Sequence, residues 1–145
     1  MTDQLAVTPI SIAITVSDYD RSVRFYTNAL GFALRVERED SVPFEPILQL
    51  HDVSFREGFL VLGAMMIALM AFETPEYIPA PKHAFNQTGI KQIAFGVPDI
   101  DAAARRNIAH GGTVLEHTRS TTPQATLLTV TDPDGTYLEL VQRTA

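Results

Sequence analysis

The chain has 145 residues, of which 46% are hydrophobic, 17 are acidic and 11 are basic, and it contains no cysteine. This length and apolar content suit one compact body that buries about two thirds of the surface of its unfolded chain. The missing cysteines exclude disulfides and thiolate chemistry and fit a reducing cytoplasm, as does the lack of a signal-peptide pattern at the start. The net charge of −6 argues against a nucleic-acid partner, which needs clustered lysine and arginine.

Residues 11–34, SIAITVSDYDRSVRFYTNALGFAL, begin with a strand pattern and continue with a helix pattern. Apolar residues alternate with small or polar ones over 12–16, as in a strand with one apolar face. Asp18 then suits the cap of a helix start, and Gly31 suits the left-handed conformation that ends a helix. A second strand pattern follows over 33–38.

The middle of the chain contains its most apolar segment, residues 59–72, FLVLGAMMIALMAF. The preceding residues 47–55 are ambiguous between helix and strand. Fourteen residues are too few to span a bilayer, so no membrane partner is expected. Gly58 and Gly63 bracket two short apolar runs, which favours a buried hairpin over a core helix. Residues 73–88 hold three of the nine prolines and are interpreted as a linker.

Residues 92–115, QIAFGVPDIDAAARRNIAHGGTVL, repeat the pattern of 11–34 at an offset of 81 positions. Further strand patterns follow over 113–117, 126–131 and 136–142, with a turn at 132–135 that suits a type I turn. Two copies are too few for a solenoid and indicate a duplicated supersecondary unit. The prediction is an α+β fold of two βαβββ modules, over 1–72 and 89–145, joined by the linker 73–88.

Three phrases, TVSDYDRSVRFYTNALGF, IAFGVPDIDAA and TDPDGTYLEL, occur within this duplication in a characteristic order. Together they resemble the vicinal oxygen chelate superfamily, which includes glyoxalase I, extradiol dioxygenases, and fosfomycin and bleomycin resistance proteins. The resemblance covers essentially the whole chain. It implies a single domain whose mixed sheets curl into a cup around a small-molecule ligand, usually in a homodimer. Because members share a scaffold and differ in chemistry, it leaves the reaction open.

The resemblance also implies where a metal would bind, at His, Glu or Gln positions on the first and fourth strands of each module. In this chain those positions hold Ser11, Ala68, Gln92 and Glu139. Alanine cannot coordinate a metal, serine is a poor ligand, and glutamine offers a neutral carbonyl, so only Glu139 is a good ligand. We therefore expect no metal and no other cofactor. A shifted strand register, or a ligand supplied by His51 or His117, is the alternative.

Strand alternation from these positions also predicts which side chains face the interior of the cup. Small residues leave volume there, and methionines provide adaptable apolar walls, although the methionines could equally pack in the core. A pocket with apolar walls and a few polar groups is typical of a small-molecule site. The expected substrate contacts are Ser11, Met66, Ala68, Met70, Gln92 and Tyr137.

Glu139 is the first candidate for catalysis. A carboxylate between Leu138 and Leu140 on an inward strand position loses part of its hydration, which suits it to proton transfer. Gln92 or Ser11 is the expected hydrogen-bond partner. The alternative is that Glu139 is held by hydrogen bonds without a task. His51 and His117 are further candidate acids or bases, while His83 and His110 are interpreted as structural or solvated.

Three functions are compatible with this site. The first is a metal-independent isomerase, lyase or cyclase that acts by general acid/base chemistry on a small, largely apolar cyclic substrate. The second is a binding protein that sequesters a drug or metabolite without chemistry, and the third is a divergent metal-dependent lyase or dioxygenase. We favour the first, because an inward carboxylate in an apolar cup is costly unless it has a task.

Overall fold

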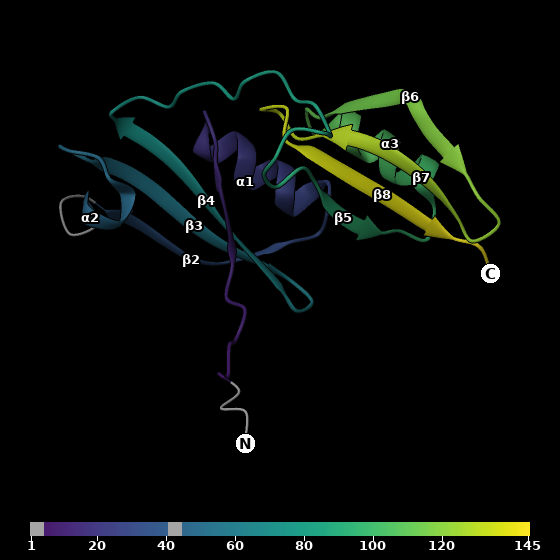
Figure 1. Ribbon diagram of the computed structural model, residues 1–145, viewed down its shortest axis with the longest axis horizontal. Helices are drawn as coiled ribbons and strands as arrows, with labels where there is room; N and C mark the ends of the chain where they lie inside the picture. Colours follow the sequence, from purple (N-terminus) through teal and green to yellow (C-terminus); the bar gives the residue numbers. More distant parts are fainter. Residues whose placement is uncertain (1–4, 41–44) are drawn as a thin grey trace.

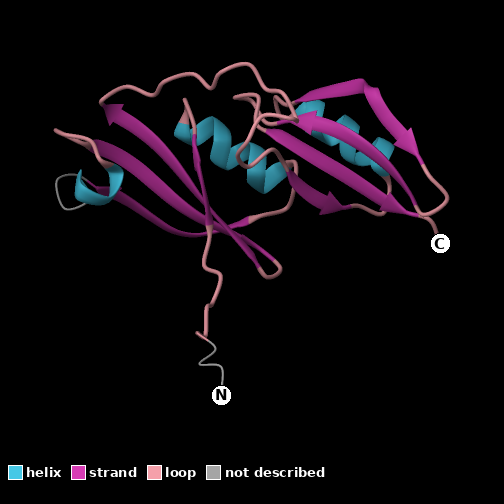
Figure 2. Ribbon diagram, viewed as in Figure 1, coloured by secondary structure: helices cyan, strands magenta, loops and turns pink. Residues whose placement is uncertain are grey.

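Two four-stranded mixed sheets stand side by side in the computed structural model, which describes residues 5–40 and 45–145 (Figure 1). A ten-residue helix lies along each sheet, and a loop that contains no helix or strand over residues 75–92, all of them described, joins the two halves (Figure 2). Within the described residues, no helix is long and apolar enough to cross a membrane.

The first half contains six elements in the strand order β1-β4-β3-β2. Strands β1 and β4 pair in parallel, and the other neighbours pair antiparallel. The elements are β1 (Ile12–Thr15), α1 (Tyr19–Asn28), β2 (Ala33–Asp40), α2 (Glu45–Leu48), β3 (Ser54–Leu62) and β4 (Met65–Thr74).

The second half repeats this arrangement in the strand order β5-β8-β7-β6, again with one parallel pair, β5 and β8. Its elements are β5 (Ile93–Gly96), α3 (Ile100–Ala109), β6 (Thr113–Thr121), β7 (Ala125–Thr131) and β8 (Tyr137–Arg143). The predicted α+β fold of two βαβββ repeats is confirmed. The exact module limits of 1–72 and 89–145 stay a prediction.

The helix boundaries follow the predicted caps. The Asp18 carboxylate accepts a hydrogen bond from the backbone N–H of Arg21 at 3.0 Å, and Asp99 accepts one from Ala102 at 2.9 Å. These bonds satisfy N–H groups that have no partner inside the helix. Gly31 and Gly111 follow the two helices with φ of 85° and 95°, which a residue with a side chain adopts only at a cost.

The structure differs from the predicted elements mainly in residues 45–62. A four-residue helix, α2, occupies part of the ambiguous segment, and β3 begins at Ser54 rather than at Phe59. The predicted hairpin is confirmed, since β3 and β4 are antiparallel partners on either side of Gly63. Its first strand, β3, is longer than expected. Glu57 continues the alternation of buried residues that begins at Phe55, but a charged residue at such a position interrupts the apolar pattern by which a strand is predicted.

The main hydrophobic core lies between the sheets and the helices. Leu60, Ile67 and Leu69 of the first sheet pack in the same cluster as Phe25 and Tyr26 of α1. The second sheet adds Ile93, Phe95, Leu128, Val130, Leu138 and Leu140, with Ile100 and Ala104 of α3. Because successive strand residues point to opposite sides, the intervening residues lie on the face away from the helices, which we call the open face.

Contacts between the two halves run through this core and the helix ends. The rings of Phe32 and Phe95 meet edge to face with centroids 5.9 Å apart. The Tyr26 hydroxyl donates to the Asp132 carboxylate at 2.8 Å, and Arg106 Nε donates to the Asn28 carbonyl at 2.5 Å. Each sheet keeps its own hydrogen-bonded ladder in the described residues, so the two sheets do not close into one barrel.

Candidate functional site

The structure brings Gln92 and Glu139 together on the open face of the second sheet. Gln92 lies just before β5 and Glu139 lies in β8, where it pairs with Ala94. The Gln92 Nε2 atom donates a hydrogen bond to Glu139 Oε2 at 2.8 Å, and both side chains are half-buried. The predicted carboxylate therefore has the predicted amide partner, which fixes one of its two oxygens.

Tyr137 lies two residues before Glu139 on the same face of β8, and the loop between the halves covers it. The His83 ring stacks on the Tyr137 ring with centroids 3.8 Å apart and planes inclined by 24°, and Phe85 lies beside both. His83 Nε2 is 3.1 Å from the Lys91 carbonyl oxygen. These contacts hold the loop against β8. No pattern in the sequence predicts them, because the loop and the strand are more than fifty positions apart.

Two adjoining clefts border this group of residues. One, of about 270 Å³, is lined by residues 12–15 of β1, residues 90–93, Thr136 and Tyr137. The other, of about 590 Å³, lies between residues 77–81 of the loop and the turn before β8, and it shares Thr15 and Tyr137 with the first. Sites for small molecules typically measure about 300–1,000 Å³, so the combined clefts are large enough for such a ligand.

The other predicted contacts belong to the first half of the chain, and they line neither of the two clefts. Ala68 pairs with Ala13 and Phe59 in the neighbouring strands and is 2% exposed. Met70 packs in a separate apolar cluster with Val53 and Phe55, which matches the core-packing alternative for that methionine. Met66 is half-buried, and Ser11 is exposed just before β1. Among the described residues, no hydrogen bond joins these four side chains to Glu139.

Neither candidate histidine is placed beside Glu139. His117 lies in β6, the outer strand, two strands from β8 and so about 10 Å away across the sheet. His51 is an exposed residue between α2 and β3. The neighbouring start of β3 lies opposite Thr74 of β4, six residues or about 20 Å along that strand from Ala68, which holds the first-module position that corresponds to Glu139. Their catalytic roles stay predictions, and each would need a site separate from that of Glu139.

A second polar pair, absent from the sequence-based prediction, lies on the open face of the first sheet. Arg38 of β2 pairs with Glu57 of β3, and its Nε and Nη2 atoms lie 2.8 and 2.7 Å from Glu57 Oε2. Glu57 is 6% exposed. The position of Glu57 between Phe55 and Phe59 could have predicted this pair, because a carboxylate between two apolar positions of a strand needs a partner.

The side chains at the family's metal positions do not fit a divalent metal ion. Ala68 has no donor atom, and the Gln92 amide directs its N–H group at Glu139, whose carboxylate is the only anionic ligand in the set. Such centres generally need three or more protein ligands from histidine and carboxylate. Over the described ranges 5–40 and 45–145, no group of three or more His, Asp or Glu side chains is arranged to hold a metal.

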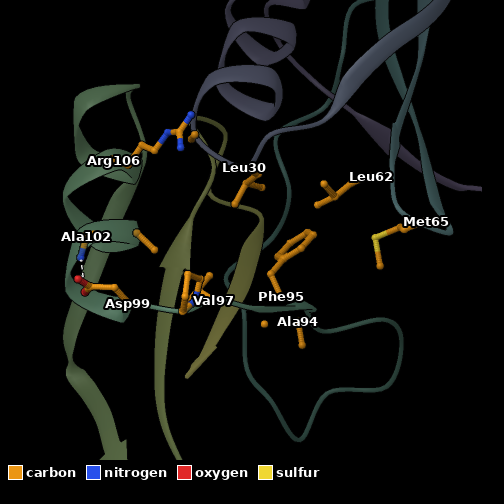
Figure 3. A pocket seen from close by; sticks show the side chains of 13 residues that line it. Leu30, Leu62, Met65, Ala94, Phe95, Val97, Asp99, Ala102 and Arg106 are labelled. Atoms are coloured by element: carbon orange, nitrogen blue, oxygen red, sulfur yellow. Dashed lines mark hydrogen bonds between the residues drawn. The ribbon is translucent and has the colours of Figure 1, made fainter. Parts of the chain in front are cut away.

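A separate groove, of about 460 Å³, lies at the junction of the halves, between the end of α1, the β3–β4 hairpin, β5 and the start of α3 (Figure 3). Leu30, Leu62, Met65 and Phe95 line it, and Arg106 stands at its edge. It contains none of the predicted site residues, and its few polar groups are engaged in structural bonds such as the Asp99 cap.

Comparisons with known proteins agree on the family. A family model, Glyoxalase/Bleomycin resistance protein/Dioxygenase superfamily, matches residues 8–140. The uncharacterized protein YaeR of Escherichia coli (strain K12) is 31% identical over 134 residues, which cover 91% of this chain and 93% of YaeR.

Solved structures share the fold. A glyoxalase family protein from Bacillus cereus superposes with a TM-score of 0.86 at 20% identity, covering 100% of this chain and 99% of the other. TnmS3, an antibiotic binding protein from Streptomyces sp. CB03234, superposes with a TM-score of 0.61 at 19% identity, covering 97% of this chain and all of TnmS3.

Proposed function

Because the chain belongs to the glyoxalase/bleomycin resistance protein/dioxygenase superfamily, we propose that it binds a small, largely apolar cyclic molecule on its open face and transforms it without a metal. Glu139 is the general acid or base, and the reaction is an isomerisation, a lyase reaction or a cyclisation. The observation that carries the proposal is the hydrogen bond to Glu139 from Gln92, which lines the smaller of the two clefts.

We assign different tasks to the two carboxylate oxygens. Oε2 accepts the Gln92 hydrogen bond, which holds the carboxylate in place, and proton transfer is assigned to Oε1. In the simplest cycle, Oε1 takes a proton from a carbon next to a ligand carbonyl and the C–H electron pair forms an enolate. The carboxyl proton exchanges with solvent, and Oε1 then donates a proton to a different carbon. Tyr137, on the same strand and face, is the proposed hydrogen-bond donor to the ligand carbonyl.

Proton abstraction can be tested before the natural substrate is known. Cyclic ketones with aromatic or polyketide-like skeletons are incubated in D₂O with the protein, and deuterium uptake is followed by mass spectrometry. Glu139→Gln should lower the rate of uptake by roughly 10² or more without loss of binding, since it keeps the shape and removes the titrating group. Glu116→Gln, at an exposed carboxylate of β6, is the matched control and should have no effect. Full activity of Glu139→Gln would refute the assignment.

Sequestration without chemistry is the second candidate. It is favoured by the placement of His51 and His117, neither of which lies beside Glu139 or lines either cleft, and by the likeness in fold to TnmS3. A sequestering protein would bind its ligand stoichiometrically and release it unchanged. Glu139→Gln would then alter affinity by less than about tenfold unless a cationic group of the ligand meets the carboxylate.

We further propose that the protein functions as a homodimer. Ala13 and Thr15 of β1 and Ala94 of β5 are exposed on the open face, so a second copy could cover them. Large apolar side chains are also exposed in the extended N-terminal segment, at Leu5, Val7 and Ile10. Apolar surface of this kind commonly marks an interface.

A further inference from the structure

The Arg38–Glu57 pair stands out because its carboxylate is buried in apolar surroundings while its guanidinium is partly exposed, and the proposed chemistry at Glu139 does not use it. The two residues lie on the open face, because their neighbours Glu37 and Gly58 face α1, where both meet the Tyr19 hydroxyl. Burying the Glu57 carboxylate costs several kcal/mol before the attraction of Arg38 is counted. A pair in this position therefore serves either the packing of the sheet or the binding of a ligand.

The two partners differ in exposure. The Glu57 side chain is 8% exposed and the Arg38 side chain is 39% exposed. The carboxylate therefore lies toward the sheet and the guanidinium toward solvent, and the pair presents its positive end to the open face. Both hydrogen bonds go to the same oxygen, Glu57 Oε2, from Nε and Nη2. This arrangement fixes the plane of the guanidinium.

The Phe59 ring borders the guanidinium end of the pair, and further aromatic side chains pack near its carboxylate end. The Arg38 guanidinium carbon lies 5.4 Å from the centre of the Phe59 ring. Phe55 and Phe72 pack with their rings 5.4 Å apart, and both belong to the same apolar cluster as Met70, which pairs with Glu57 across β3 and β4. A cation bordered by flat apolar groups is complementary to a flat ring that bears an acidic group.

From this juxtaposition we infer that Arg38 binds the acidic group, a carboxylate, sulfonate or phenolate, of a planar aromatic ligand on the open face of the first sheet. Glu57 is a positioning residue that holds the guanidinium and, being negative, also weakens its attraction for the ligand. The inference rests on the proposed function in taking the open face as the ligand-binding face, and it adds an acidic aromatic character to the ligand.

Two fluorescent probes of similar shape test this. Anilinonaphthalene sulfonate carries a sulfonate, and N-phenylnaphthylamine has the same ring framework without the charge. Arg38→Met should weaken binding of the sulfonate by at least about tenfold and leave the neutral probe within about twofold. Glu57→Gln should act in the opposite direction and tighten sulfonate binding by about threefold, because a nearby negative charge is removed. A purely structural pair would weaken both probes in both variants.

Further variants keep the test decisive. Arg38→Gln, which keeps a donor to Glu57 but loses the charge, must reproduce the selective loss if Arg38→Met does not fold. Arg106→Met removes the cation at the groove of Figure 3 and should leave both affinities unchanged. The inference is overturned if the native protein binds neither probe, if Arg106→Met rather than Arg38→Met weakens the sulfonate, or if Glu57→Gln weakens it. Retained deuterium uptake in Glu139→Gln, alongside a selective loss in Arg38→Met, would refute the proposed function alone.

Discussion

Tyr26→Phe removes one oxygen atom from the junction of the two halves, and its effect on stability can be worked out from the structure. The Tyr26 hydroxyl donates to Asp132 Oδ2 at 2.8 Å across 106 positions of sequence, and the two residues are 0% and 1% exposed. Asp132 Oδ1 accepts from the N–H groups of Asp134 and Thr136. The substitution therefore leaves Oδ2 without its proton donor in a buried place.

Loss of a buried hydrogen bond to a charged group costs about 1.5–3 kcal/mol, out of a total of about 5–15 kcal/mol for a domain. At roughly 3 °C per kcal/mol for a chain of this size, Tm should fall by about 5–9 °C. The aromatic contacts of the ring with Phe25 and Phe32 are kept, so no packing loss is added. Chemical denaturation at pH 7 gives the free energy of unfolding directly.

The pH dependence provides a second check with a defined sign. Burial raises the pKa of the Asp132 carboxyl above its ordinary value, and the Tyr26 hydrogen bond is one of the contacts that oppose this rise. The variant therefore has the higher Asp132 pKa. Its deficit in stability is largest where the carboxyl is ionised in both proteins, and the deficit narrows as the pH falls and Asp132 takes up a proton.

Tyr19→Phe is the matched control. The Tyr19 hydroxyl donates at 2.9 Å to Glu37, an exposed carboxylate that water can solvate instead, so the expected cost is below about 1 kcal/mol. A deficit below about 0.5 kcal/mol for Tyr26→Phe, or one that widens on acidification, would refute the reasoning.

Three further outcomes are expected. Gly112→Ala should destabilise the fold by about 2–3 kcal/mol, because the new Cβ would lie 2.4 Å from the Thr131 carbonyl oxygen. Gly96→Ala is the control: a Cβ there would have nothing within 4 Å, so the free energy of unfolding in the same denaturation assay should change by less than about 0.5 kcal/mol. Light scattering at micromolar concentration should give the mass of a dimer, twice 16.0 kDa, and a monomer would contradict the proposed assembly. Activity should survive a chelator, and elemental analysis should find no stoichiometric Zn, Fe or Mn; one ion per chain would contradict this.

The fold could be predicted because it depends on local signals that occur twice. Asp18 and Asp99 cap helices in equivalent places, and each follows a short alternating strand, so the duplication indicates the topology without any long-range information. The segment 45–62 lacked a duplicate with the same pattern. There α2 and the early start of β3 depend on Leu48 and Phe55 joining a separate apolar cluster, which only the folded chain brings together.

The candidate site could be predicted in part for the same reason. Gln92 and Glu139 hold the first-strand and fourth-strand positions that correspond to Ser11 and Ala68 in the other module, and the structure joins them by a hydrogen bond. The Arg38–Glu57 pair depends on the register of β2 against β3, including an irregularity between Leu34 and Val36, which no pattern in the sequence specifies.

The stacking of His83 on Tyr137 also depends on the path of the loop over residues 75–92, which no pattern in the sequence specifies.

A crystal structure with a compound that the protein transforms would test the central claim most directly. The account predicts that this compound lies on the open face, with its reacting carbon within about 3.5 Å of the Glu139 carboxylate. Electron density for the compound in the groove between α1 and α3, with the Gln92–Glu139 pair in contact only with water, would contradict it.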